Sequence, residues 1–189
     1  MYIAYNGVIV LFTGQFKSVL LLLMHGARVS VLDKRGYTPL QQALLREQAD
    51  IAILLIQHGA YLHTYSKSTD SPLKMCCKMS NAVLVKCMLD GGCDLSLEPW
   101  FSVEVIKEKL RELDYVRSSR FHRKNSRELW ESIKSSLEAM PSLLQTTRLN
   151  LRRHLLYSSG GKSVAESVKF LNIPPVLKRY LTLDDVYYA

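Results

Sequence analysis

The pattern of apolar and polar positions repeats along the first half of the chain with a period of 33 residues. Leu22, Leu55 and Met88 fall in step, each within an apolar run that ends a few residues later at a glycine. The glycines keep the same spacing, at Gly26, Gly59 and Gly92. A fixed period of about 20 to 50 residues is typical of a solenoid, in which similar units stack and bury their apolar faces. The pattern therefore predicts a stack of about three units over residues 1–98.

Turn and capping residues mark the ends of the helices expected in each unit. Thr38 is placed to cap a helix whose first residue is Pro39, where a missing amide hydrogen costs nothing. The three glycines suit the left-handed conformation that closes the last turn of a helix. The residues of 33–36 are then expected to form the turn into the next unit.

The middle unit resembles an ankyrin repeat. Residues 36–43 read G-Y-T-P-L-Q-Q-A, close to the family pattern G-x-T-P-L-H-x-A, and residues 54–60 follow with L-L-I-Q-H-G-A. The resemblance implies an all-α solenoid of helix pairs. Residues 1–32 look like a degraded first repeat, and the third repeat is a weaker copy. Gln41 and Lys74 replace the family's histidine, which puts its hydrogen bond between neighbouring repeats in question.

The cysteines fit packing positions better than a disulfide framework or a metal site. All four lie within eighteen residues, at Cys76, Cys77, Cys87 and Cys93. Their spacing lacks the paired clusters of a zinc site, and Cys93 stands where the other repeats have alanine. We therefore expect reduced, buried thiols, no metal and no cofactor, and a cytoplasmic or nuclear location. His25 and His58 recur at one repeat position, which favours a structural role.

A stack of repeats presents helix faces and turn tips as a binding surface for another protein. The candidate target-binding residues on the expected concave side are Arg35, Gln42, Arg46, Tyr65, Lys67, Lys74 and Lys78. Solvated polar positions also explain each of them individually, and the target itself cannot be identified from these residues.

Residues 99–140 lose the period and are expected to form a helical linker. One helix is predicted by the apolar positions Val103, Ile106, Leu110 and Leu113, and a second by Leu129, Trp130, Ile133 and Leu137. The basic stretch at 117–127 lies between them. The formal charge of +8 permits nucleic-acid binding there, but the acidic residues that flank the stretch favour a solvated loop. We expect neither a nucleic-acid partner nor a membrane span, because the apolar runs near the N-terminus are too short to cross a bilayer.

The C-terminal residues resemble a SOCS box, for which we expect the bounds 141–183 and three helices. Residues 142–155 read S-L-L-Q-T-T-R-L-N-L-R-R-H-L, in register with the family's first helix, S-L-x-x-L-C-R-x-x-I-R-x-x-L. Gly160 and Gly161 then break the helix, and residues 163–166 form a capping box. Residues 171–181, L-N-I-P-P-V-L-K-R-Y-L, resemble the closing motif L-P-x-P-x-x-L-K-x-Y-L.

This resemblance implies two binding surfaces. The residues expected to bind Elongin C, four apart on one helix face, are Leu143, Thr147, Leu151 and Leu155. Those expected to face the cullin or to support that surface are Ile173, Pro174, Leu177, Tyr180 and Leu181. Two residues depart from the family pattern. Thr147 replaces a cysteine of the Elongin motif, and Asn172 replaces the first proline of the cullin motif, which leaves the choice of the fifth cullin less certain.

Together the two resemblances identify the chain as a member of the ankyrin repeat and SOCS box family, over residues 7–96 and 142–181. The implied function is that of a non-catalytic substrate receptor in a cullin-RING ubiquitin ligase. The repeats would hold a protein target, and the box would bind Elongin B, Elongin C and a cullin with its RING subunit. The alternatives are an ankyrin scaffold whose box no longer binds the Elongins and a nucleic-acid adaptor that uses residues 117–127.

Overall fold

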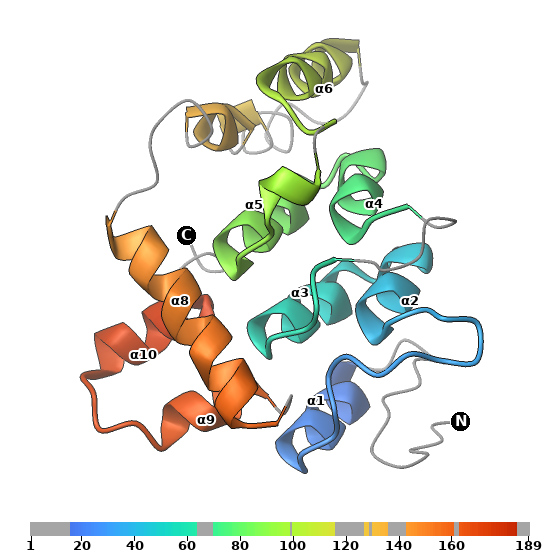
Figure 1. The fold of residues 1–189 in the computed structure, drawn as a ribbon. Coiled ribbons are helices and arrows are strands. Elements are labelled where there is room, and N and C mark those ends of the chain that lie inside the picture. The colour runs from blue at the N-terminus through green and yellow to red at the C-terminus, as the bar shows by residue number, and fades with distance from the viewer. Residues whose placement is uncertain are drawn as a thin grey trace.

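The computed structural model describes residues 16–63, 70–98, 100–115, 127–128, 130–135, 143–160 and 163–184. Over these residues the regular structure is helical, and no strand is assigned (Figure 1). The all-α fold class predicted from the sequence is therefore confirmed for the described part of the chain.

Pairs of helices stack in register over the first half of the chain. The helices are α1 (Phe16–Met24), α2 (Pro39–Leu45), α3 (Ala49–Gln57), α4 (Pro72–Lys78) and α5 (Ala82–Gly91). Val19, Ala52 and Val85, which are 33 residues apart, are all fully buried where α1, α3 and α5 stack. The repeat period thus corresponds to one layer of the stack. The region before α1, where the degraded first repeat begins, lies outside the described residues.

Gln41, which stands where the family pattern has histidine, helps to cap its own helix. The backbone amide of Gln41 donates to the Thr38 hydroxyl (3.2 Å), and the amide of Thr38 donates to the Gln41 side chain (3.0 Å). Both residues are buried. This reciprocal capping box satisfies two of the amides that a helix N-terminus leaves unpaired.

The predicted turns and helix ends are also present. Gly26, Gly59 and Gly92 have φ of +78°, +88° and +103°, the left-handed conformation expected after each second helix. In the turn before α2, one carboxylate oxygen of Asp33 accepts hydrogen bonds from the amides of Arg35 (2.8 Å) and Tyr37 (2.9 Å). These helix ends and this turn depend only on residues that are close together in the sequence.

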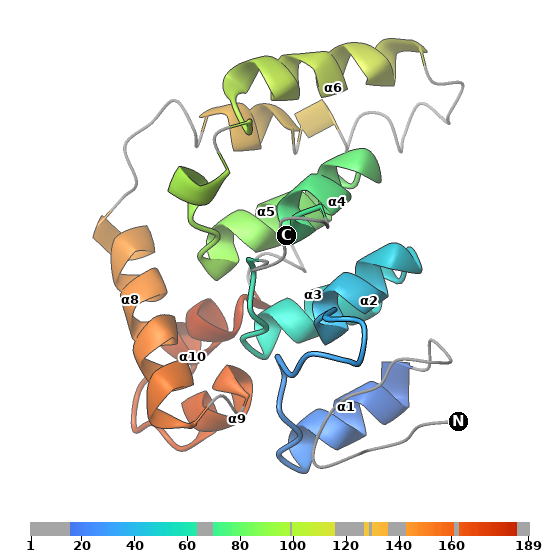
Figure 2. The same ribbon diagram turned by 45° about the vertical axis from the view of Figure 1, so that its right-hand side comes forward.

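The expected linker packs against the repeat stack and shares its core. Helix α6 (Val103–Tyr115) follows the short 3-10 turn η1 (Leu95–Leu97), and residues 127–128 and 130–135 are also helical. Ile106, Trp130 and Ile133 are fully buried in the same hydrophobic core as the repeats. These helices lie beyond α4 and α5 (Figure 2), so they cover the apolar end that the last repeat would otherwise expose to water.

The C-terminal helices fold back along the side of the stack. They are α8 (Leu143–Ser158), α9 (Val164–Lys169) and α10 (Pro175–Thr182), which we call the C-terminal module. The module has a small core of its own, formed by Val164, Val168 and Leu181. Helix α8 runs beside the ends of the repeat helices (Figures 1 and 2) and packs against α5.

A buried arginine joins the C-terminal module to the repeats. The Arg152 guanidinium on α8 donates to the carbonyl oxygens of Ile56 (2.7 Å) and Gln57 (3.3 Å) at the end of α3, and to that of Leu181 at the end of α10. Its side chain is only 4% exposed. The last carbonyls of a helix lack partners within the helix and carry partial negative charge. One cation therefore satisfies two helix ends that belong to different parts of the fold.

His58 makes a second connection, which gives a structural role to one of the two recurring histidines. Its ring nitrogen Nδ1 lies 2.6 Å from the Ser163 hydroxyl, which also caps α9 by accepting a hydrogen bond from the Glu166 amide (3.1 Å). The His58 carbonyl accepts a hydrogen bond from the Val164 amide (2.9 Å). Burial lowers the pKa of His58 to about 4, so its ring is neutral at physiological pH.

Two of the repeat glycines allow the module to approach closely. A Cβ atom at Gly59 would lie 2.5 Å from a methyl group of Val164, and one at Gly92 would lie 3.1 Å from Leu149. Leu183, just after α10, is fully buried in the core of the repeats. These glycines therefore end the second helices of the repeats and also leave room for the module to pack against them.

Replacing Arg152 with methionine is expected to lower the free energy of unfolding by about 2–4 kcal/mol, because two buried carbonyls and one half-buried carbonyl lose a charged donor. Denaturant unfolding of the full chain measures this change. The adjacent Arg153 is exposed, so Arg153→Met is the matched control and should change stability by less than about 0.5 kcal/mol. Equal effects of the two substitutions would contradict the bridging role of Arg152.

The depressed pKa of His58 predicts that acid weakens the fold. The unfolded histidine gains a proton below about pH 6.5, whereas the folded one stays neutral until about pH 4. Stability is therefore complete above pH 6.5 and falls by about 1.4 kcal/mol per pH unit as the pH drops toward 4. Denaturant unfolding at several pH values measures the slope. The variant His58→Asn, which keeps a polar atom near the Nδ1 position, should have a shallower slope than the wild type between pH 6.5 and 5.

Candidate functional site

Helix α8 has a face buried in the fold and a face open to solvent. Arg148 and Arg152 lie on the buried face, whereas Thr147 and Leu151 are exposed, with Leu151 45% exposed. Leu155 is half-buried and packs against the small core of the module. Leu143 begins the helix, but its side chain lies outside the described residues. The expected Elongin-binding residues thus share the helix, and the structure places two of them on its open face.

The second arginine on the buried face holds α10 against α8. The Arg148 guanidinium lies 3.5 Å from the centre of the Tyr180 ring, a cation–π contact that is strengthened by exclusion of water. Burial and the neighbouring Arg148 lower the pKa of Arg152 to about 10, which leaves it charged at neutral pH. The sequence motif includes both arginines, but the motif alone does not reveal what they contact.

The expected cullin-facing residues divide between surface and core. Pro174 is exposed just before α10, and Leu177 is 44% exposed on the helix. Ile173 and Tyr180 are half-buried. Leu181 is 4% exposed and belongs to the small core of the module, so in this chain it supports the surface from below.

Three further apolar side chains of the module are exposed, although the motif positions did not single them out. They are Tyr157 on α8, Phe170 at the end of α9 and Val176 on α10, each at least three-quarters exposed. An apolar residue outside a family pattern gives no signal of its exposure in the sequence, because exposure depends on how the three helices pack together.

The target-binding candidates on the repeats are only partly brought together. Arg35 and Arg46 are exposed beside α2, and the Gln42 side chain donates to Asp33 (2.7 Å). Lys74 and Lys78 on α4 both pair with Asp70, and their hydrogen bonds lower the pKa of that carboxyl group. Tyr65 and Lys67 lie outside the described residues, as does the basic stretch at 117–126.

The cysteines are buried, as expected. Burial raises the pKa of the Cys77 and Cys93 thiols to about 12, and it raises that of Cys76 well above its usual value. These groups are protonated at neutral pH, which is the wrong state for a thiolate nucleophile.

Within the part of the chain that the structure describes, no helix is long and apolar enough to cross a membrane.

The two leucines of α10 provide a direct test of this placement. Leu181→Ala removes the larger part of a leucine from the module's core and is expected to lower the free energy of unfolding by about 2–4 kcal/mol. Leu177→Ala, one turn earlier on the exposed surface, should cost less than about 1 kcal/mol. Denaturant unfolding distinguishes the two variants, and a reversed order would contradict the assignment of Leu181 to the core.

Comparisons with known families agree with this arrangement. A model of ankyrin repeats, in three copies, matches residues 7–98, and a model of the SOCS box matches residues 139–182. A search of curated proteins found no match. Both modules are typically non-catalytic adaptors, and together they support a substrate-adaptor role in a SOCS-box ubiquitin ligase. With these two modules in this order on one chain, the protein belongs to the ankyrin repeat and SOCS box family.

Proposed function

We propose that this protein is the substrate receptor of a ubiquitin ligase built from Elongin B, Elongin C, a cullin and its RING subunit. The C-terminal module recruits the ligase, and the ankyrin repeats hold a target protein. The chain itself carries out no bond chemistry. It contributes proximity, because holding a target beside the ubiquitin-charged enzyme makes the transfer effectively intramolecular. This function places the protein in the cytoplasm or the nucleus.

The observation that carries the proposal is the division of α8 into two faces. Arg148 and Arg152 fix its inner face against α10 and the repeats. The outer face, with Thr147 and Leu151, is left open to solvent. A helix that offers one face to an apolar groove is a common mode of recognition. The proposed partner for this face is Elongin C, with Leu143 as the anchor at the start of the helix.

Thr147 weakens this contact without removing it. A hydroxyl that enters an apolar groove without a hydrogen-bond partner costs about 1–3 kcal/mol. A threonine in a helix can offset part of this cost by bonding back to a carbonyl one turn earlier. Restoring the family's cysteine at this position is therefore expected to strengthen Elongin binding.

The proposed cullin surface lies around the start of α10. Pro174 and Leu177 are exposed there, with Ile173, Tyr180 and Leu181 packed behind them as support. Asn172 is also exposed where the family pattern has a proline. The fifth cullin is the proposed partner, and the loss of this proline predicts a weaker preference for it.

Co-expression with Elongin B and Elongin C, followed by size exclusion, tests the proposal. The wild-type chain should elute with both Elongins, whereas Leu143→Asp and Leu151→Asp should lose the complex because each buries a charge in an apolar groove. Arg153→Asp changes an exposed residue of the same helix on a different side and should keep the complex. Thr147→Cys should bind at least as tightly as the wild type.

A folded wild-type chain that never elutes with the Elongins would overturn this function. That result would favour the alternative in which the protein is an ankyrin scaffold that acts without ubiquitin. Loss of the complex in Arg153→Asp as well would show that the helix as a whole, rather than its outer face, determines the result.

A further inference from the structure

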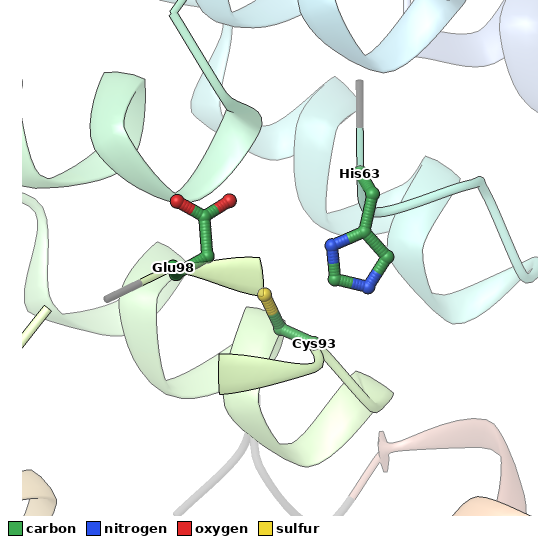
Figure 3. A group of neighbouring side chains, drawn as sticks. All are labelled: His63, Cys93 and Glu98. Atoms are coloured by element: carbon green, nitrogen blue, oxygen red, sulfur yellow. The ribbon is translucent and has the colours of Figure 1, made fainter. Parts of the chain in front are cut away.

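Three side chains of different chemistry meet at the edge of the repeat stack. His63 lies in the segment after α3, Cys93 follows the glycine that ends α5, and Glu98 follows η1. An imidazole nitrogen, the thiol sulfur and a carboxylate oxygen all lie within 4.8 Å of one another. Figure 3 shows the three side chains gathered in one place. No part of the proposed ligase function uses them.

Packing explains this cluster incompletely. Cys93 occupies a position where the other repeats have alanine, so a small buried residue is sufficient there. Glu98, however, is only 4% exposed, and its hydrogen-bond donors among the described residues are neutral: the Ser71 hydroxyl (2.8 Å) and the Trp100 indole. A buried carboxylate that meets only neutral donors among the described residues is costly, and a bound metal ion would offset that cost.

The spacing of the cysteines predicted no metal site, but these three ligands come together only in the folded chain. We propose that His63, Cys93 and Glu98 form a binding site for a zinc ion. Sulfur, nitrogen and oxygen ligands of this kind suit Zn²⁺, whereas Mg²⁺ and Ca²⁺ prefer oxygen ligands alone. Zinc binding releases the proton of the Cys93 thiol to solvent. The resulting thiolate, the Glu98 carboxylate and a neutral imidazole then balance the charge of the divalent ion. Water completes the tetrahedral coordination in the fourth position.

The geometry requires a small contraction. Zinc bonds of about 2.0–2.3 Å keep tetrahedral ligand atoms roughly 3.3–3.8 Å apart. The distances between the three ligand atoms, at most 4.8 Å here, must therefore shorten by about 1 Å. Rotation of the side chains and adjustment of the loops can supply this change. His63 is half-buried while the other two ligands are buried, so an ion can enter from the histidine side.

The histidine ring presents one nitrogen to the cluster. Its Nε2 accepts a hydrogen bond from the Asp94 amide (3.1 Å), while the buried Nδ1 makes none with the described residues. A metal on Nδ1 takes the place of the proton there, and the neutral ring then carries its proton on Nε2. Zinc binding consequently breaks the bond from Asp94. This hydrogen bond is exposed, so water can replace the histidine as the acceptor for the Asp94 amide.

The site would tie together three parts of the fold. His63 belongs to the second repeat and Cys93 to the third, while Glu98 leads into the helices that cover the end of the stack. Ser71 and Trp100 hold the carboxylate in place, the kind of support that orients a metal ligand. Bound zinc is therefore expected to stabilise the junction between the repeats and the following helices.

Metal binding by the full chain tests the site directly. The protein is stripped with a chelator, and Co²⁺ or Zn²⁺ is added at increasing concentration. We expect one metal ion per chain, a thiolate-to-cobalt charge-transfer band in the near ultraviolet, and a higher unfolding temperature with Zn²⁺. Cys93→Ala restores the residue of the other repeats, so it should fold while losing the band and binding metal more than about 10-fold more weakly.

Two further variants make the result specific. Cys77→Ala removes a buried thiol outside the cluster and should keep the band. Ser71 and Trp100 both donate to the same carboxylate oxygen, so Glu98→Gln keeps one acceptor oxygen for both but should weaken metal binding at least 10-fold. Circular dichroism confirms that each variant is folded. The proposal is overturned if the wild type retains no metal, if bound cobalt shows no thiolate band, or if Cys93→Ala binds metal as tightly as the wild type.

Discussion

The position of the C-terminal module depends on a single buried cation. Arg152 reaches from α8 to the carbonyl ends of α3 and α10, so it links the repeats and the module through groups that each helix leaves unpaired. Its charge is stabilised by the negative ends of two helices rather than by a carboxylate. His58 and Ser163 reinforce the same junction, and Gly59 leaves room for the contact.

This junction determines which surface the module offers to a partner. Once the inner face of α8 is fixed, Thr147 and Leu151 point into solvent, and the start of α10 is exposed nearby. Neither surface includes Arg152 or His58, which hold the module to the repeats. The helices after the third repeat have a different role. Their residues Ile106 and Trp130 cover the apolar end of the stack.

Much of the fold could be predicted because its signals are local. The 33-residue period, the Thr38 cap and the glycines that end the second helices all depend on residues close together in the sequence. Each one sets a helix boundary through hydrogen bonds or backbone conformation within a few residues. The spacing of four also places the candidate binding residues of α8 along one side of a helix. Thr147 and Leu151 are exposed there, whereas Leu155 packs against the core of the module.

What the sequence alone determined is therefore the set of helices, their order and the two families of modules. Only the tertiary structure decided that the module folds back onto α3, that Leu181 is buried while Leu177 is exposed, and that His63, Cys93 and Glu98 meet. These outcomes depend on contacts between residues far apart in the chain. No local spacing encodes such contacts, because they arise from the summed packing of several helices.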